Sequence, residues 1–103
     1  MDYKSLRWKR KRERILRRDK YMCQDAKRYG RAEEATTVHH IYPAAEYPEY
    51  RWATWNLTSL SAENHGKMHD KTTGILTEKG MEWQRRTVPP DKKKNTPPGC
   101  DFQ

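Results

Sequence analysis

The sequence predicts a small α+β fold, and three observations support this prediction. The chain has 103 residues, of which 33% are hydrophobic and 35% are charged, so it can form at most one domain with a small core. Residues 4–20 contain no glycine or proline and have the character of a helix. Residues 36–38 are β-branched and lead directly into a pair of histidines, which indicates a strand.

The expected N-terminal helix, residues 4–20, is basic. Asp2 or Ser5 can cap its start, and Trp8 and Ile15 form a thin apolar stripe together with Leu16. Core packing is the expected role of Trp8, ahead of stacking on a nucleic-acid base. The arginines that surround this stripe should face outward and bind DNA, and they are Arg7, Arg10, Arg14, Arg17 and Arg18.

Positive charge is concentrated in this first segment. The formal net charge of the chain is +8, and residues 1–20 contribute +7 of it, from ten Lys or Arg residues and three acids. A local block of this size favours a polyanionic partner, and arginine forks match the geometry of phosphate. The alternative is a solvated basic face that only aids solubility.

Other classes of protein are excluded. The two cysteines, Cys23 and Cys100, cannot provide the disulfide framework of a small secreted domain. No apolar run has the length of a membrane span or of a signal peptide. We therefore expect a cytoplasmic protein with free thiols and no membrane contact.

Between the basic helix and the histidines, residues 21–37 are expected to form a hairpin with a turn at Tyr29-Gly30-Arg31. Pro43 should end the strand that carries the histidine pair. The aromatic side chains of residues 44–55 should then cover the core, and the alternative is contact with nucleic-acid sugars or bases.

Two more helices should follow. The first covers residues 61–70 with Ser61 as its N-cap. The second covers residues 76–86, with Thr77 as its cap and with Met81 and Trp83 as possible apolar anchors. From residue 88 onward the chain is rich in proline and lysine, which predicts a flexible basic tail over residues 88–103.

All four histidines lie within one stretch of the chain. His65 and His69 are four residues apart on an expected helix, so both rings can face one metal ion. A third ligand must then come from His39 or His40. Three protein ligands leave room for water and substrate, as in catalytic metal sites, and the spare histidine can take a proton from water. The alternative is a structural zinc site with an incidental fourth histidine.

This pattern resembles the motif of the HNH endonucleases, in the ββα-metal (His-Me finger) form. The motif consists of His39-His40-Ile41, Asn56 and His65-x3-His69, with 16 residues from His40 to Asn56 and 9 from Asn56 to His65. Its three-histidine version resembles the nuclease domains of DNase colicins. Residues 8–24 resemble the start of the short HNH endonucleases of bacteriophages, and the likeness spans about residues 3–72.

The resemblance implies a role for each residue of the motif. His40 corresponds to the general base. Asn56 corresponds to the asparagine that holds the connecting loop and so orients the base. The metal ligands would be His39, His65 and His69. The cofactor would be one divalent ion, with Mg, Mn, Zn, Ni and Co all open.

The resemblance also implies a domain organisation. An HNH endonuclease domain would cover residues 1–87, with the basic helix in 1–20, a ββα-metal core in 21–70 and a C-terminal helix before the tail. Many phage relatives carry two C-x2-C pairs that bind a structural zinc. The corresponding residues here are Cys23, Ala26, Ser61 and Asn64, so we expect no such zinc.

The function implied by the resemblance is metal-dependent hydrolysis of DNA, with 5′-phosphate and 3′-hydroxyl products and low sequence specificity. One site cuts one strand, so a double-strand break would need a dimer or two visits, and both nicking and double-strand cutting stay open. The protein would be a monomer or a weak dimer. Phage relatives of this size often act beside the packaging terminase in the host cytoplasm, whereas others are mobile-intron or restriction nucleases. The alternative from another class is a non-catalytic, metal-stabilised DNA-binding module.

Overall fold

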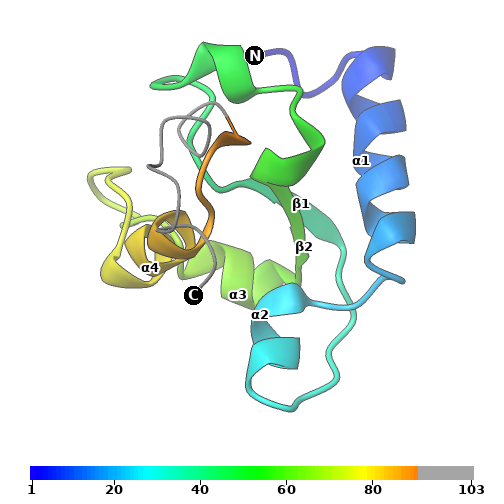
Figure 1. Ribbon diagram of the computed structural model, residues 1–103, viewed down its shortest axis with the longest axis vertical. Coiled ribbons are helices and arrows are strands. Elements are labelled where there is room, and N and C mark those ends of the chain that lie inside the picture. Colours follow the sequence, from blue (N-terminus) through cyan, green and yellow to red (C-terminus); the bar gives the residue numbers. More distant parts are fainter. Residues whose placement is uncertain (91–103) are drawn as a thin grey trace, which may run out of the picture.

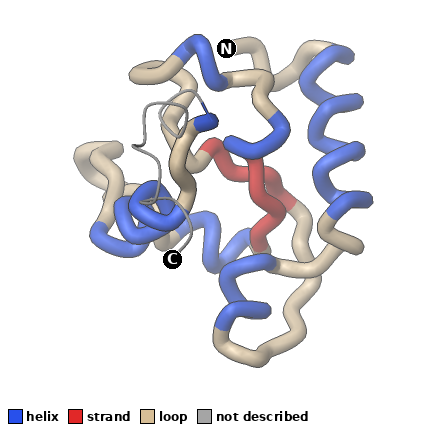
Figure 2. Tube along the Cα trace, viewed as in Figure 1, coloured by secondary structure: helices blue, strands red, loops and turns tan. Residues whose placement is uncertain are grey.

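A two-stranded antiparallel sheet lies at the centre of the molecule, and helices surround it (Figures 1 and 2). The structure is a computed structural model that describes residues 1–90. Strand β1 (Thr37–His40) pairs with β2 (Leu57–Leu60), with His39 opposite Thr58 and His40 opposite Leu57. The α-helices are α1 (Leu6–Arg18), α2 (Gln24–Arg28), α3 (Ala62–Gly66) and α4 (Glu78–Arg86). This architecture confirms the predicted small α+β fold.

Helix α1 packs beside the sheet, on the opposite side from α3 and α4 (Figure 1). The Ser5 hydroxyl accepts a hydrogen bond from the backbone N–H of Trp8 at 3.1 Å, so Ser5 caps the helix as expected. Trp8 is 5% exposed, which confirms core packing. The first core cluster lies between α1 and the sheet and consists of Trp8, Ile15, Leu16, Ala35, Val38 and Leu57.

A second core cluster joins the other elements. Its buried residues are Cys23, Ala26, Leu60 and Met68, and the half-buried Trp83 of α4 packs against them. Trp83 is thus the apolar anchor of α4. The prediction that Met81 is an apolar anchor is wrong, because Met81 is 39% exposed. The error arose because α4 has only nine residues, and in so short a helix the spacing of apolar residues does not define one buried face.

The hairpin predicted over residues 21–37 is wrong in its main part. Only one isolated bridge, Met22 with Glu34, joins its two ends, and α2 lies between them. The N–H of Lys27 donates to the Cys23 carbonyl at 3.0 Å, which starts a helical turn instead of a strand ladder. The turn around Gly30 (φ +75°) is present, and it ends this helix.

The helix predicted over residues 61–70 begins at the expected cap, Ser61, but ends four residues early. Helix α3 stops at Gly66, and His69 lies in an isolated bridge with Leu76. The reason is tertiary: the carbonyl of the buried Met68 accepts hydrogen bonds from the N–H and the hydroxyl of Thr77. Thr77 also caps α4, as predicted, so this contact turns the chain out of the α3 helix and into α4.

Strand β2 is the second strand of the ββα-metal core implied by the resemblance, although no strand was assigned to residues 57–60 from their own sequence pattern. The connection before β2 contains two short 3₁₀ helices, η1 (Pro48–Tyr50) and η2 (Thr54–Asn56).

Of the expected tail over residues 88–103, residues 91–103 lie outside the described part of the chain. Within residues 1–90, none of the helices has the length and apolar character needed to cross a bilayer.

Candidate active site

Strand β1 positions both histidines of the pair at one cavity. Neighbouring residues of a strand point to opposite faces. His39 accordingly faces α3, whereas His40 and Val38 face Trp8 of α1. Because β1 ends at His40, both rings still reach the same cavity, which has a volume of about 510 Å³. His65 and His69 also line this cavity, so the structure brings all four histidines together.

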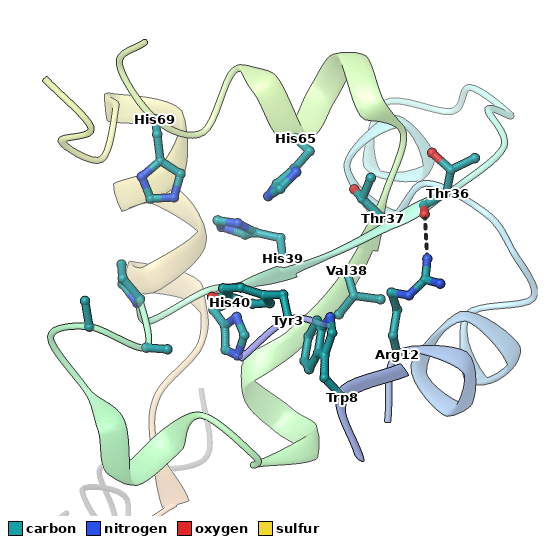
Figure 3. Close-up of a pocket in the computed structure, with 13 residues that line it drawn as sticks. Tyr3, Trp8, Arg12, Thr36, Thr37, Val38, His39, His40, His65 and His69 are labelled. Atoms are coloured by element: carbon teal, nitrogen blue, oxygen red, sulfur yellow. Dashed lines mark hydrogen bonds between the residues drawn. The ribbon is translucent and has the colours of Figure 1, made fainter. Parts of the chain in front are cut away.

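The rings of His39, His65 and His69 form a cluster at one end of the cavity (Figure 3). The ring centre of His39 lies 5.3 Å from that of His65 and 5.7 Å from that of His69. His39 is 1% exposed, and its Nε2 atom is buried without a hydrogen-bond partner. Burial, together with the three neighbouring imidazoles, lowers the pKa of His39 to about 3, so this ring is neutral at pH 7.

The cluster suits a divalent ion by its chemistry. Neutral imidazole is the form that binds metal, and a buried nitrogen without a partner is the atom that a metal ion would satisfy. In His69 the Nδ1–H donates to the Gly74 carbonyl at 3.2 Å, since a carbonyl can only accept, and this leaves Nε2 as a potential ligand. As they stand, no three His, Cys, Asp or Glu side chains within residues 1–90 are arranged to hold an ion, so the rings would have to rotate to do so.

His40 is held in a defined orientation. Its ring stacks on Trp8, with ring centres 5.2 Å apart and an interplanar angle of 19°. Its Nε2 lies 3.0 Å from the carbonyl oxygen of Arg51, so Nε2 carries the hydrogen and Nδ1 is the acceptor. Burial lowers the pKa of His40, although the bond to Arg51 opposes this effect, so the neutral ring dominates at pH 7. A neutral imidazole with an open nitrogen can accept a proton.

Asn56 holds the loop that supplies the Arg51 carbonyl. Its side chain is fully buried, and its Oδ1 accepts from the N–H of Tyr42 at 2.7 Å. Its Nδ2 donates to the carbonyls of Tyr42 at 3.0 Å and Tyr50 at 3.2 Å. Because these bonds tie the end of β1 to the residue before Arg51, Asn56 acts on His40 through the loop and not by direct contact.

The five arginines expected to bind DNA differ in their surroundings in the structure. Arg7, Arg10 and Arg14 line an open groove between α1 and Trp52. Arg17 lies 3.4 Å from the carboxylate of Glu13 and is exposed. The Arg18 side chain is 40% exposed, but it makes contacts within the protein: it lies 2.8 Å from the Asp19 carboxylate and donates to the carbonyls of Thr54 and Leu57.

One arginine that the sequence did not single out as a site residue, Arg12, lines the histidine cavity (Figure 3). Its Nη1 donates to the carbonyl of Thr36 at 3.4 Å. Tyr3 and Trp8 line the same cavity. A signal was present in the sequence: Arg12 is four residues after the buried Trp8 and therefore lies on the same helix face, toward the sheet.

The four positions that correspond to the zinc ligands of phage relatives lie close to one another in a hydrogen-bonded cluster. The Asn64 amide donates to the Cys23 sulfur at 3.4 Å and to Glu33 at 3.0 Å, and the Ser61 hydroxyl donates to Glu33 at 3.2 Å. Burial raises the pKa of the Cys23 thiol, but hydrogen bonds from Ser61, Ala26 and Asn64 outweigh burial and lower it. This cluster joins the starts of α2 and α3.

Comparison with known proteins points to one kind of enzyme. No family model and no curated protein matches the sequence. Among solved structures, the chain is similar to the HNH endonuclease of the deep-sea thermophilic bacteriophage GVE2, crystallised with manganese ion. The two share 29% sequence identity over 84% of this chain and 82% of the other, with a TM-score of 0.61. This likeness supports the HNH family, and it agrees with the ββα arrangement described above.

Proposed function

We propose that this protein is a metal-dependent HNH endonuclease that hydrolyses DNA phosphodiester bonds. One observation carries the proposal: the Arg51 carbonyl holds His40 through Nε2, which leaves Nδ1 without a hydrogen-bond partner among residues 1–90, beside three further imidazoles in one cavity. A structural metal site alone would have no use for this fourth, oriented histidine. The likeness to the phage HNH endonuclease supports the proposal of a nuclease.

In this proposal His40 is the general base. Its Nε2–H donates to the Arg51 carbonyl, so Nδ1 accepts the proton of the attacking water. Stacking on Trp8 fixes the plane of the ring. Asn56 is a positioning residue, because its hydrogen bonds hold the loop that carries the Arg51 carbonyl.

The ligands of the divalent ion would be His39, His65 and His69. A divalent ion bound there would offset the negative charge that develops on the phosphate and on the leaving oxygen. The structural neighbour contains manganese, which makes Mn²⁺ the first ion to test, ahead of Mg, Zn, Ni and Co. Arg12, at the edge of the same cavity, is placed to contact a phosphate oxygen.

The substrate and the biological role belong to the same proposal. The basic face of α1 suits the phosphates of DNA, and the products would be a 5′-phosphate and a 3′-hydroxyl. One active site in a monomer would nick one strand, and a double-strand break would require a weak dimer or two visits. The size of the chain and the phage origin of its structural neighbour favour a phage protein that assists genome packaging beside the terminase.

A supercoiled-plasmid assay tests this function. Wild type and His40→Ala are incubated in parallel lanes with EDTA, Mg, Mn, Zn, Ni or Co. We expect cutting by the wild type only in lanes with metal, and a loss of roughly 10²–10⁴-fold in His40→Ala, because general-base catalysis contributes that much. Circular dichroism and Mn²⁺ titration should show that the variant is folded and binds metal.

Two results would contradict the proposal. Equal cutting by both proteins would show that His40 is not the base or that the activity is a contaminant. Intact plasmid in every lane, with DNA binding retained, would identify the protein as a metal-stabilised binding module.

A further inference from the structure

The groove between α1 and Trp52 is separate from the histidine cavity and is strongly basic. Its volume is about 410 Å³, and none of the residues within 1–90 that line it is acidic. The residues that line it are Leu6, Arg7, Arg10, Lys11, Arg14 and Trp52. Four cations around one open groove create a local positive potential, and a row of phosphates is the ligand that complements it.

Arg7 is held in place at the edge of this groove. Its guanidinium carbon lies 3.9 Å from the centre of the Trp52 ring, which is a cation–π contact. Trp52 is half-buried and packs against the first core cluster, so it provides a fixed surface for the guanidinium. A pre-oriented arginine loses less side-chain entropy when it binds phosphate than a free one does.

The positive charges of the groove are close enough to affect one another. Lys11, which also lines the groove, donates from its Nζ to the Thr54 hydroxyl at 2.8 Å, and this bond restrains its side chain. Burial, followed by the charges of Arg14 and Arg18, lowers the pKa of Lys11. Like charges held together in this way repel one another, and binding an anion between them relieves that repulsion.

The groove lies next to the proposed active site. The ring centre of Trp52 is 6.4 Å from that of Trp8, and Trp8 stacks on His40 at 5.2 Å. Trp8 also lines the histidine cavity, so one ring contact, between Trp52 and Trp8, joins the lining of the groove to the lining of that cavity. One nucleotide of a duplex strand advances about 3.4 Å along the axis, so a strand would cross this separation within a few nucleotides.

We propose that this groove binds the backbone phosphates of the same DNA strand whose phosphodiester lies in the histidine cavity, a few nucleotides from the bond that is cut. Arg7, Arg10 and Arg14 contact these phosphates, and Trp52 is a positioning residue for Arg7. The proposal rests on the proposed nuclease function for the occupant of the cavity. In this proposal the basic helix has two kinds of arginine: those of the groove bind phosphate, whereas Arg18 has a structural role and donates to backbone carbonyls.

Binding of DNA measured at several salt concentrations tests the groove. A labelled 20-base-pair duplex is titrated with protein in the His40→Ala background, so that the DNA stays intact, and the slope of log K against log[NaCl] is recorded. We expect Arg7→Ala, Arg10→Ala and Arg14→Ala each to weaken binding several-fold and to reduce the slope by about 1, since each removes one phosphate contact.

Lys9→Ala is the matched control. Lys9 is exposed on the same helix and carries the same charge, but it does not line the groove. We expect its removal to leave the slope nearly unchanged. If Lys9→Ala lowered the slope as much as Arg10→Ala does, binding would depend on diffuse charge, and the groove would be rejected.

A double-mutant cycle tests the role of Trp52. Trp52→Leu keeps an apolar side chain against the core but removes the aromatic face, whereas Trp52→Phe keeps a ring. We expect Trp52→Leu to weaken DNA binding when Arg7 is present, and to add nothing when Arg7 is already alanine, with Trp52→Phe close to wild type. Independent, additive losses would overturn the positioning role.

The results separate this inference from the proposed function. If wild-type protein cuts plasmid but the three arginine variants keep the full salt slope, the groove is wrong and the nuclease stands. If the wild type does not cut but the slopes fall as expected, the groove binds DNA and the nuclease function is wrong.

Discussion

At the scale of single residues, two contacts define the tautomer and the orientation of His40. A histidine in isolation has two neutral tautomers, which differ in the ring nitrogen that carries the hydrogen, and no fixed orientation. Here the Arg51 carbonyl selects the form with hydrogen on Nε2, and the Trp8 ring restrains its plane. The orientation therefore depends on Asn56, which secures the loop between β1 and β2 without touching the imidazole.

His39 makes the stability of the metal-free protein depend on pH. Its pKa is about 3 in the folded protein and 6.5 in an unfolded chain, because burial excludes the charged ring. Between these values the unfolded chain binds a proton that the folded protein does not, so protonation favours unfolding. The contribution of the neutral His39 to the stability of the folded protein is therefore complete only above about pH 6.5. Below that value we expect the free energy of unfolding to fall, by up to about 1.4 kcal/mol per pH unit for this proton.

Urea unfolding in EDTA between pH 4.5 and 7.5 measures this dependence. His39→Gln is the comparison, because it removes the titrating ring and keeps a polar side chain of similar length. His40 and His65 also have lowered pKa values and contribute to both proteins, so the difference between the two slopes isolates His39. Identical slopes in the two proteins would contradict the prediction.

At the scale of elements, Asp25 joins two helices that are far apart in the sequence. Its carboxylate is fully buried on α2, accepts a hydrogen bond from Trp83 Nε1 at 3.0 Å and lies 2.7 Å from Lys79 Nζ on α4. Burial raises the pKa of Asp25, but the hydrogen bonds and charge of Lys79, together with the bond from Trp83, lower it below its usual value. These contacts complement the apolar packing of Trp83 on the second core cluster.

We expect Asp25→Ala to lower the free energy of unfolding by about 2–3 kcal/mol, because it removes hydrogen bonds to a charged group and leaves Trp83 Nε1 without an acceptor. Asp25→Asn keeps the acceptor and should lose less. Urea unfolding near pH 7 measures both, and the difference from wild type should shrink as the pH falls below about 4, because the unfolded chain takes up a proton on this carboxylate at a higher pH than the folded protein does.

The matched control on α4 is Glu78→Ala. Glu78 pairs with Arg85 at 2.7 Å in a solvent-exposed ion pair, and such pairs contribute about 0–1 kcal/mol. If Asp25→Ala cost no more than Glu78→Ala, the link between α2 and α4 would have no role in stability.

At the scale of the whole molecule, the apolar core of residues 1–90 includes two small clusters. One lies between α1 and the sheet, and the other joins α2, β2 and α4. A fold of this size has little apolar surface to bury, so a bound ion can contribute a large share of its stability. The proposed ligands come from β1, from α3 and from the bridge after α3, so an ion there would tie these segments together.

We therefore expect Mn²⁺ to raise the melting temperature. An ion present at 100 times its dissociation constant stabilises the folded state by about 2.7 kcal/mol. For a domain of this size that corresponds to a rise of about 10–20 °C. Differential scanning fluorimetry with and without EDTA measures the effect, and His65→Ala should abolish the Mn²⁺-dependent rise. The same rise in wild type and His65→Ala would exclude His65 as a ligand.

The sequence by itself determined the features that depend on neighbouring residues. The caps Ser5, Ser61 and Thr77 predicted where three helices begin, because a cap acts within one turn of chain. The basic first segment and the spacing of the histidines were visible in the same way. The α+β class followed from these local patterns, and the structure confirms it.

Only the tertiary structure decided which of these features meet. The pairing of β1 with β2, the early end of α3 at Gly66 and the approach of His69 to His39 all depend on contacts between distant segments. The same holds for the internal role of Arg18, which donates to carbonyls more than 30 residues away. Local propensity cannot specify such contacts, because the packing of the whole chain selects the partner of each hydrogen bond and of each buried side chain.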